Sequence, residues 1–295
     1  MKDIFLLLKK LPVLLMTYIS PQLFSDMKQY FVLSAKKWTK TFPIEIHVVE
    51  HCNLNCSGCN HFSSLASEEY LDSVKFEKDC ARLSKLSPKL FALKLLGGEP
   101  LLHPEITEFF DIARKYFKDT PIQITTNGLL LTNLSTGFWE SCGRNKIKIS
   151  ISKYPIKLNI KAIKKLTKEY GVKLEFTGTT HKMRMCKLPL DLSGSQDIKD
   201  SYKNCVTGWG CCVTLRDGKI YNCCTVAHIK FFNSYFNQNL LAGENDYLDI
   251  YKADSKQDII DFITKPFPFC RYCRAREIKF GLEWGISKKE IGEWV

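Results

Sequence analysis

The spacing of apolar positions changes twice along the chain. In the middle part, short apolar runs alternate with segments of helical periodicity. We expect strands at residues 44–49, 90–96, 121–125, 147–151 and 172–176, and helices at 104–117, 137–142 and 158–170. Strands that are apolar on both faces and alternate with helices are typical of a parallel sheet covered by helices. The sequence therefore predicts an α/β fold, namely a partial (β/α)6 barrel of the TIM-like type.

The segments on either side of this pattern are different. Residues 1–42 are expected to form a helical, amphipathic extension, interrupted at Pro21. Residues 213–222 predict a β-hairpin, because Asp217-Gly218 is a favoured two-residue turn. Further helices are expected at 255–264 and, as a short final helix, at 287–295. We therefore predict three parts: the extension at 1–42, the barrel at 43–200, and a small hairpin-and-helix domain with the tail at 201–295.

The first sixteen residues look at first like an export signal. Lys9, Lys10 and Pro12 interrupt the apolar run, however, and no small-residue cleavage site follows. The run is also too short to span a bilayer. We expect a helix packed on the body of the protein, in preference to contact of residues 1–20 with a membrane surface. Without an export signal the expected location is the cytoplasm.

Composition narrows the possible functions. Hydrophobic residues make up 45% of the chain, which is enough for a packed core and excludes a disordered protein. The formal net charge of +12 favours an anionic partner, but no long basic run is interleaved with aromatics, so nucleic acid is not an expected partner. The 13 cysteines gather in local groups. Such groups suit metal or iron–sulfur ligation better than disulfides.

The first group of cysteines follows the first predicted strand. Cys52, Cys56 and Cys59 lie in a short loop where barrel enzymes place their chemistry. Three thiolates can hold three irons of a four-iron cluster and leave the fourth iron open, whereas a closed cluster would need four. The alternative is a zinc site completed by His51 or His61.

The C-x3-C-x2-C spacing of this group resembles the signature of the radical S-adenosylmethionine (SAM) superfamily. The resemblance implies that the open iron of a [4Fe–4S] cluster binds SAM, whose reductive cleavage gives a 5′-deoxyadenosyl radical that abstracts hydrogen. Gly97-Gly98-Glu99-Pro100, Thr126-Asn127-Gly128 and Ser150-Ile-Ser152 resemble further family motifs. The implied cofactor-binding residues are Gly97, Gly98, Glu99, Asn127, Ser150 and Ser152.

One position departs from the family pattern. Family members usually carry an aromatic residue before the third cysteine, where it packs on adenine, and here that residue is Gly58. The adenine contact would then come from another residue, for which Phe62 is the candidate.

A second set of cysteines surrounds the predicted hairpin and a later C-x2-C motif. It resembles the twitch form of the SPASM appendix of radical SAM enzymes, which implies a closed auxiliary [4Fe–4S] cluster that transfers electrons. The ligands that we choose are Cys205, Cys223, Cys270 and Cys273. Cys212 and Cys224 remain alternatives, and a zinc ribbon is the competing interpretation.

Side chains that act on the substrate are harder to identify. Lys153 and Arg184 are candidates for a base that removes a hydroxyl proton, if both lie at the barrel mouth. Cys212 is the chosen candidate for a thiol that donates hydrogen to a substrate radical. The other thiols considered are Cys186, Cys211 and Cys224. His103 is interpreted as a helix-start residue, and His228 has no assigned role.

The function that follows is an oxidoreductase or isomerase reaction of the radical SAM type. The expected substrate is a small, polar, carbohydrate-like molecule, which includes anionic and nucleotide-linked sugars. The expected reaction is dehydrogenation or epimerisation. A flavodoxin- or ferredoxin-type protein is the expected electron donor. The alternatives are a peptide-modifying maturase, although residues 1–40 are too few for a peptide-binding domain, and a non-catalytic iron–sulfur or zinc protein.

Overall fold

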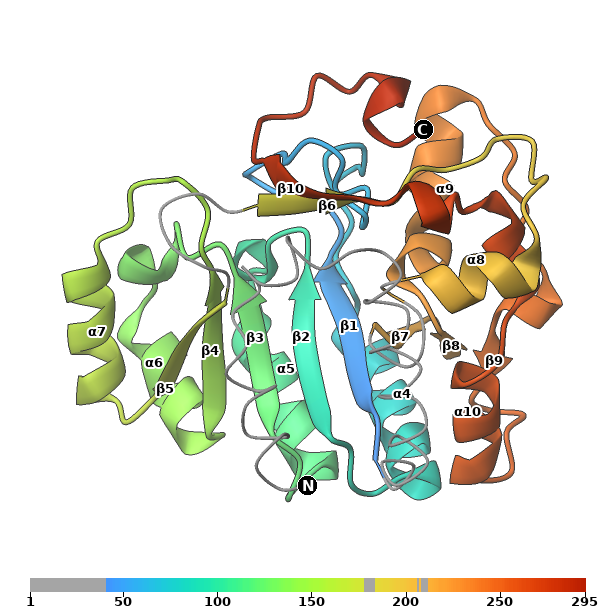
Figure 1. Cartoon of the computed structure of the whole chain (residues 1–295). Coiled ribbons are helices and arrows are strands. Elements are labelled where there is room, and N and C mark those ends of the chain that lie inside the picture. The colour runs from blue at the N-terminus through green and yellow to red at the C-terminus, as the bar shows by residue number, and fades with distance from the viewer. Residues whose placement is uncertain (1–40, 178–183, 206, 208–211) are drawn as a thin grey trace, which may run out of the picture.

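The computed structural model describes residues 41–177, 184–205, 207 and 212–295 (Figure 1). Residues 1–40 of the predicted helical extension lie outside the described residues. The structure therefore does not test the expectation about a membrane surface. Cys211 also lies outside the described residues. No helix within the described ranges combines the length and the apolar character needed to cross a membrane.

A mixed sheet of eight strands, in the order β5-β4-β3-β2-β1-β7-β8-β9, forms the centre of the fold. Its first five strands in the sequence are β1 Pro43–Val49, β2 Ala92–Gly97, β3 Ile122–Thr126, β4 Ile147–Ser152 and β5 Lys173–Thr177. Each of these pairs in parallel with the next. The apolar runs in the sequence predicted all five strands to within two residues at either end. The parallel β/α arrangement confirms the predicted fold class of a partial TIM-like barrel.

Helices cover the far face of this sheet and the edge of β5 (Figure 1). They are α4 Ser73–Leu86, α5 Ile106–Tyr116, α6 Thr136–Arg144 and α7 Ile160–Glu169. The helix α4 was not predicted. It begins at the cap residue Asp72, whose carboxylate accepts a hydrogen bond from Lys75 N, and it buries Phe76, Cys80 and Leu83 on one face. The spacing of these apolar residues, four and then three positions apart, is the sequence pattern from which α4 could have been predicted.

The predicted hairpin is confirmed, and it joins the barrel sheet. It consists of β7 Thr214–Arg216 and β8 Lys219–Tyr221, with Asp217 and Gly218 both at positive φ. Strand β7 pairs in parallel with β1 through Glu45 and Thr214, and β8 pairs with β9 Leu248–Asp249. The sixth parallel strand of the sheet therefore lies beside β1, not beyond β5.

A second hydrophobic core lies beside the first, in the C-terminal part of the chain. Its helices are α8 Ile198–Asn204 and α9 Cys224–Phe236, whereas α10 Lys256–Ile263 buries its isoleucines in the first core. In the same part of the chain a two-stranded sheet joins β6 Arg184–Lys187 to β10 Lys279–Glu283. The short 3-10 helices among the described residues are η1 Pro100–Leu102, η2 Leu131–Asn133, η3 Glu244–Asp246, η4 Pro268–Tyr272, η5 Ala275–Glu277 and η6 Ile291–Glu293. Helix α10 matches its prediction. The tail contains the short η6 in place of the longer helix expected.

The second core also takes up residues of the first cysteine loop. Phe62 packs against Phe232 and Trp294 at centroid distances of 5.6 and 6.2 Å. Leu188 and Leu190, from the end of β6 onward, belong to the same cluster of buried residues. The division of the chain at residue 200 remains a prediction, because the second core contains residues from before and after that position.

The glycine loop after β2 lies against the end of β1. A Cβ on Gly97 would lie 2.0 Å from Val49 O, and one on Gly98 would lie 1.9 Å from His51 O. Two backbone hydrogen bonds hold the contact: Gly98 N donates to Val49 O at 2.8 Å and Glu99 N to His51 O at 3.1 Å. Only glycine permits backbones to approach this closely.

The variant Gly98→Ala tests this contact. We expect it to destabilise the protein by about 2 kcal/mol or more, because the new methyl group must displace the backbone beside Cys52. Gly137→Ala is the matched control, because the added Cβ would have Ser135 Oγ as its nearest neighbour, at an ordinary 3.7 Å. Urea unfolding measures both variants, and equal stability of the two would contradict the packing described here.

Candidate active site at the carboxyl ends of the strands

A cavity of about 180 Å³ lies where the first four strands end. Its lining comes from the loops after β1, β2, β3 and β4, and consists of Cys52, Leu54, Cys56, Cys59, His61, Ser63, Ser64, Leu96, Gly97, Gly98, Thr125, Thr126, Asn127, Ser152 and Tyr154. Parallel strands direct their carboxyl ends to one edge of the sheet, which explains why loops so far apart in sequence meet here. The three predicted cluster cysteines all line this cavity.

The three thiols are largely buried and close together. Burial raises the pKa of Cys52 to about 12 and that of Cys56 to about 11, and it also raises that of Cys59. Negative charge on the neighbouring thiols adds to the shifts of Cys52 and Cys56. Thiolates crowded in this way are costly unless a cation compensates them. The donor set therefore fits a bound metal or iron–sulfur group.

The C-terminal tail holds the cysteine loop in place. Trp284 Nε1 donates to Cys56 Sγ at 3.0 Å, and Ser57 N donates to Gly285 O at 2.8 Å. Further along, Glu293 Oε2 accepts hydrogen bonds from Ser57 Oγ at 2.7 Å and Gly58 N at 3.2 Å. Sequence reasoning missed these residues, because no local signal connects positions more than 220 residues apart.

The C-terminal tail also explains why position 58 is a glycine, where the family pattern has an aromatic residue. Gly58 has a φ of +62°, and a Cβ there would lie 3.2 Å from Glu293 O. The backbone conformation and the tail thus both disfavour an aromatic residue. The alternative candidate, Phe62, is 1% exposed, packs into the second core and does not line the cavity. The expectation that Phe62 contacts adenine is therefore wrong in this structure.

Glu99 connects two of the predicted motifs. Its carboxylate accepts hydrogen bonds from Leu101 N at 3.1 Å, Thr126 Oγ1 at 2.6 Å and Asn127 N at 2.9 Å. Burial raises its pKa to about 7. Glu99 does not line the cavity and instead holds the glycine loop against the TNG loop.

The other predicted cofactor-binding residues divide into two groups. Gly97, Gly98, Asn127 and Ser152 line the cavity. Asn127 is oriented by two bonds of its side chain: Nδ2 donates to Asn53 Oδ1 at 2.7 Å, and Oδ1 accepts from Leu129 N at 2.9 Å. Ser150 is fully buried and does not line the cavity. The buried hydroxyl of Ser64, which does line it, has no hydrogen-bond partner among the described residues and is available to a ligand.

The candidates for catalysis are placed less favourably. Lys153 is exposed, and its Nζ lies 5.3 Å from the centre of the Phe176 ring instead of in the cavity. The next residue, Tyr154, does line the cavity and hydrogen-bonds to Cys56. Arg184 begins β6, and its side chain lies outside the described part of the chain.

The structure brings the second set of cysteines together. Cys205, Cys223, Cys270 and Cys273 are all buried in the second core. Burial raises the pKa of Cys270 to about 12, and charge on Cys223 and Cys205 adds to the shift. The alternatives lie beside this group, since the thiol of Cys224 hydrogen-bonds to both Cys223 and Cys212. The four chosen thiols therefore form one buried group, and Cys212, Cys224 and Cys186 lie near it.

Comparison with known proteins agrees with this site. Residues 44–150 match the family described as a 4Fe-4S single cluster domain. A probable GTP 3′,8-cyclase of Methanocaldococcus jannaschii is 29% identical over 53% of this chain and 51% of its own length. The GTP 3′,8-cyclase of Chlorobaculum tepidum is 36% identical over 30% of this chain and 26% of its own length. The chain thus matches about half of the first relative and a quarter of the second.

A solved structure resembles the fold over most of the chain. It is BtrN in complex with AdoMet and 2-DOIA, with a TM-score of 0.50 and 16% identity, and the match covers 79% of this chain and 93% of that one. Together with the cysteine spacing, the 4Fe-4S family match and these likenesses support a radical SAM superfamily enzyme.

The buried carboxylate of Glu99 gives a prediction for the architecture of the site. In Glu99→Ala, two backbone amides and the Thr126 hydroxyl lose their acceptor, which should cost about 2 kcal/mol or more of unfolding free energy. The exposed Glu140, on α6, provides the control variant Glu140→Ala. A thermal melt that shows no difference between the two variants would mean that Glu99 does not hold the two loops together.

Proposed function

We propose that this chain is a radical SAM enzyme that acts at the cavity described above. The observation that carries the proposal is that Cys52, Cys56 and Cys59 line one cavity with Gly97, Gly98, Asn127 and Ser152. Three thiols suit a [4Fe–4S] cluster with one open iron. When bound, the cluster and SAM supply a 5′-deoxyadenosyl radical, which abstracts hydrogen from the substrate.

The residues of the chain bind and orient. Gly97 and Gly98 present backbone at a point where a ligand can approach closely, and Asn127 and Ser152 add polar side-chain atoms. Glu99 holds the glycine loop against the loop after β3. Trp284 and Tyr154 hydrogen-bond to Cys56 and orient its thiol.

We propose that the second thiol group holds a closed auxiliary cluster. Four buried cysteines from three segments, Cys205, Cys223, Cys270 and Cys273, supply the ligand number that such a cluster needs. A cluster with no open iron would transfer electrons and would not bind substrate. A flavodoxin- or ferredoxin-type protein remains the proposed donor of the first electron.

For the substrate we propose a small, polar, carbohydrate-like molecule that is dehydrogenated or epimerised. The high net positive charge supports an anionic compound. The likeness to BtrN, which was solved with AdoMet and 2-DOIA, extends over most of both chains. It supports a common fold for the two proteins. The matches to GTP 3′,8-cyclases favour a nucleotide as the second candidate. Transfer of deuterium from a labelled sugar or nucleotide into 5′-deoxyadenosine distinguishes the two.

Removing one thiol of the first group tests the catalytic centre. Cys56→Ala should abolish formation of 5′-deoxyadenosine from SAM under dithionite. Two thiolates cannot ligate the three irons of the cluster that need a cysteine. Cys142→Ala, in a buried position on α6, should retain it. Turnover by Cys56→Ala at the control rate would refute the proposed active site.

The auxiliary cluster is tested by iron content. After anaerobic reconstitution, Cys270→Ala should contain about four irons fewer per chain than the wild type. The spectrum of the SAM-binding cluster should stay unchanged in the same sample. Cys80→Ala, buried in the first core, serves as the control. Unchanged iron in Cys270→Ala would leave the second group as a zinc or purely structural site.

A further inference from the structure

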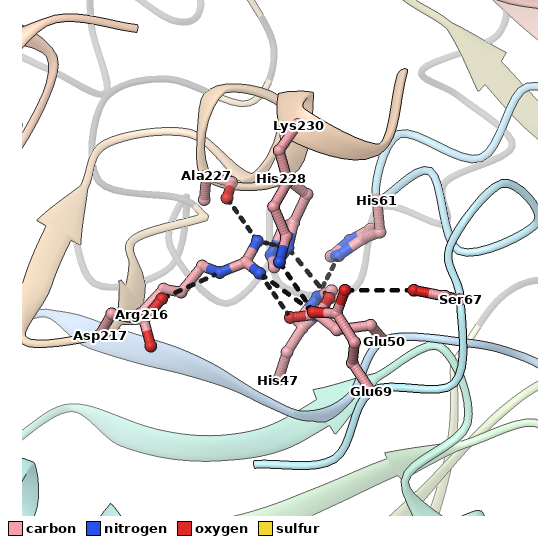
Figure 2. Close-up of polar contacts among 10 residues, drawn as sticks. All are labelled: His47, Glu50, His61, Ser67, Glu69, Arg216, Asp217, Ala227, His228 and Lys230. Atoms are coloured by element: carbon pink, nitrogen blue, oxygen red, sulfur yellow. Dashed lines mark hydrogen bonds and ion pairs between the residues drawn. The ribbon is translucent and has the colours of Figure 1, made fainter. Parts of the chain in front are cut away.

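Three histidines from distant parts of the chain meet between the two cores. His47 lies on β1, His61 follows the last cysteine of the first loop, and His228 lies on α9 (Figure 2). One ring nitrogen from each lies within 4.8 Å of the others. His47 is 5% exposed and His228 0%. Nothing in the proposed reaction uses this cluster.

Glu50 determines the orientation of two of the rings. Its Oε2 lies 2.9 Å from His47 Nδ1 and 3.2 Å from His228 Nδ1, as Figure 2 shows. Arg216 Nη2 lies 3.3 Å from Oε1 and gives this buried carboxylate a cationic partner. A carboxylate only accepts hydrogen bonds, so we assign the proton of each imidazole to Nδ1.

Arg216 Nη1 also lies 3.1 Å from His228 Nδ1. This nitrogen of Arg216 carries two hydrogens and donates one of them to Ala227 O at 2.8 Å, so its distance to His228 does not by itself fix the tautomer. A lone pair on His228 Nδ1 would face the Glu50 carboxylate at 3.2 Å, which is repulsive. Donation from His228 Nδ1 to Glu50 is therefore the better assignment, and the Nε2 atoms of His47 and His228 then carry lone pairs and no hydrogen.

The two lone pairs lie on the same side. The rings of His47 and His228 stack with centroids 3.6 Å apart and an angle of 18°, and both Nδ1 atoms contact the same oxygen. Their Nε2 atoms therefore lie together at the other end of the stack, where His61 Nδ1 is 2.6 Å from His47 Nε2. His228 Nε2 is buried and has no hydrogen-bond partner in the described part of the chain. A buried lone pair without a donor is costly unless a ligand occupies it.

We propose that His47, His61 and His228 bind one divalent transition-metal ion, with Zn²⁺ as the fitting ion. Imidazole nitrogens suit zinc, and a carboxylate that accepts from the far nitrogens of two ligand histidines is a recurrent support of such sites. Nitrogens that share a tetrahedral zinc at ~2.0–2.1 Å lie about 3.3 Å apart, so His47 and His61 would separate by about 0.7 Å. The stacked rings of His47 and His228 would also rotate until both lone pairs point at the ion. Three protein ligands leave one position for water or another small ligand.

The proposed ion would connect β1, the cysteine loop and α9. His61 lies two residues after Cys59 and lines the active-site cavity, while His47 and Glu50 line a neighbouring cavity of about 260 Å³. The ion would thus fix the loop directly behind the third cysteine. The site uses nitrogen ligands alone, so it is separate from both cysteine groups and does not depend on the radical SAM assignment.

The experiment measures zinc and iron together on the full-length protein. After anaerobic reconstitution, incubation with Zn²⁺ and dialysis, we expect about one tightly bound zinc per chain. Zinc K-edge X-ray absorption should show nitrogen neighbours at ~2.0–2.1 Å and no sulfur near 2.3 Å. Zinc with sulfur neighbours, or none retained, would overturn the proposal. This measurement requires no variant, so it decides the question even if the variants fail to fold.

Variants identify the ligands. His228→Ala should lose the zinc and keep its iron, whereas His103→Ala, which removes a buried histidine bound to Leu71 O, should keep both. Glu50→Gln should weaken zinc binding 10–100-fold, as expected for a residue that orients ligands. Full zinc in His228→Ala would overturn the proposal. In the wild-type protein, zinc retained without the expected iron would count against the clusters and not against this site.

Discussion

The whole site depends on the close contact between the ends of β1 and β2. Gly98 N and Glu99 N donate to carbonyl groups at the end of β1, at distances that leave no space for a side chain. This contact sets the glycine loop beside the start of the cysteine loop. The carboxylate of Glu99 then extends the same arrangement to the loop after β3. Backbone hydrogen bonds and one buried carboxylate thus fix three of the four loops that form the cavity.

β1 also connects the barrel to the C-terminal part of the chain. It pairs with β2 on one side and with β7, the first strand of the hairpin, on the other. From its carboxyl end come His47, Glu50 and the cysteine loop, and all of these contact the C-terminal part of the chain. The tail adds Trp284 and Glu293 from the opposite side. The cysteine loop is therefore held between both parts of the molecule, which suits a loop that must present three thiols in a fixed arrangement.

The sequence predicted those features that have local causes. Apolar runs located all five parallel strands, Asp217-Gly218 located the hairpin, and the spacing of cysteines identified two thiol groups that the structure brings together. Helix α9 was missed because it is buried on nearly all sides and shows no amphipathic period. The pairing of β6 with β10 joins segments about a hundred residues apart, which no local pattern reveals.

The same limit applies to the side chains of the site. The roles of Glu99 as a cross-link between loops and of Trp284 as a donor to Cys56 follow from contacts across the fold, as does the meeting of three histidines. Phe62 was misassigned for the opposite reason. Its position next to the motif suggested a ligand contact, whereas a positive φ and the aromatic residues Phe232 and Trp294 place it in the second core. Residue type and proximity in sequence give the chemistry of a loop but not the direction of each side chain.

The central claim is that one buried cavity, formed by three cysteines and a glycine loop, performs radical chemistry on SAM. The most direct measurement is the iron and sulfide content of the anaerobically reconstituted wild-type protein, with 5′-deoxyadenosine assayed in the same sample under dithionite. The account predicts about eight irons per chain, as two four-iron clusters require, together with formation of 5′-deoxyadenosine. A protein that binds zinc at its cysteines and forms no 5′-deoxyadenosine would contradict it.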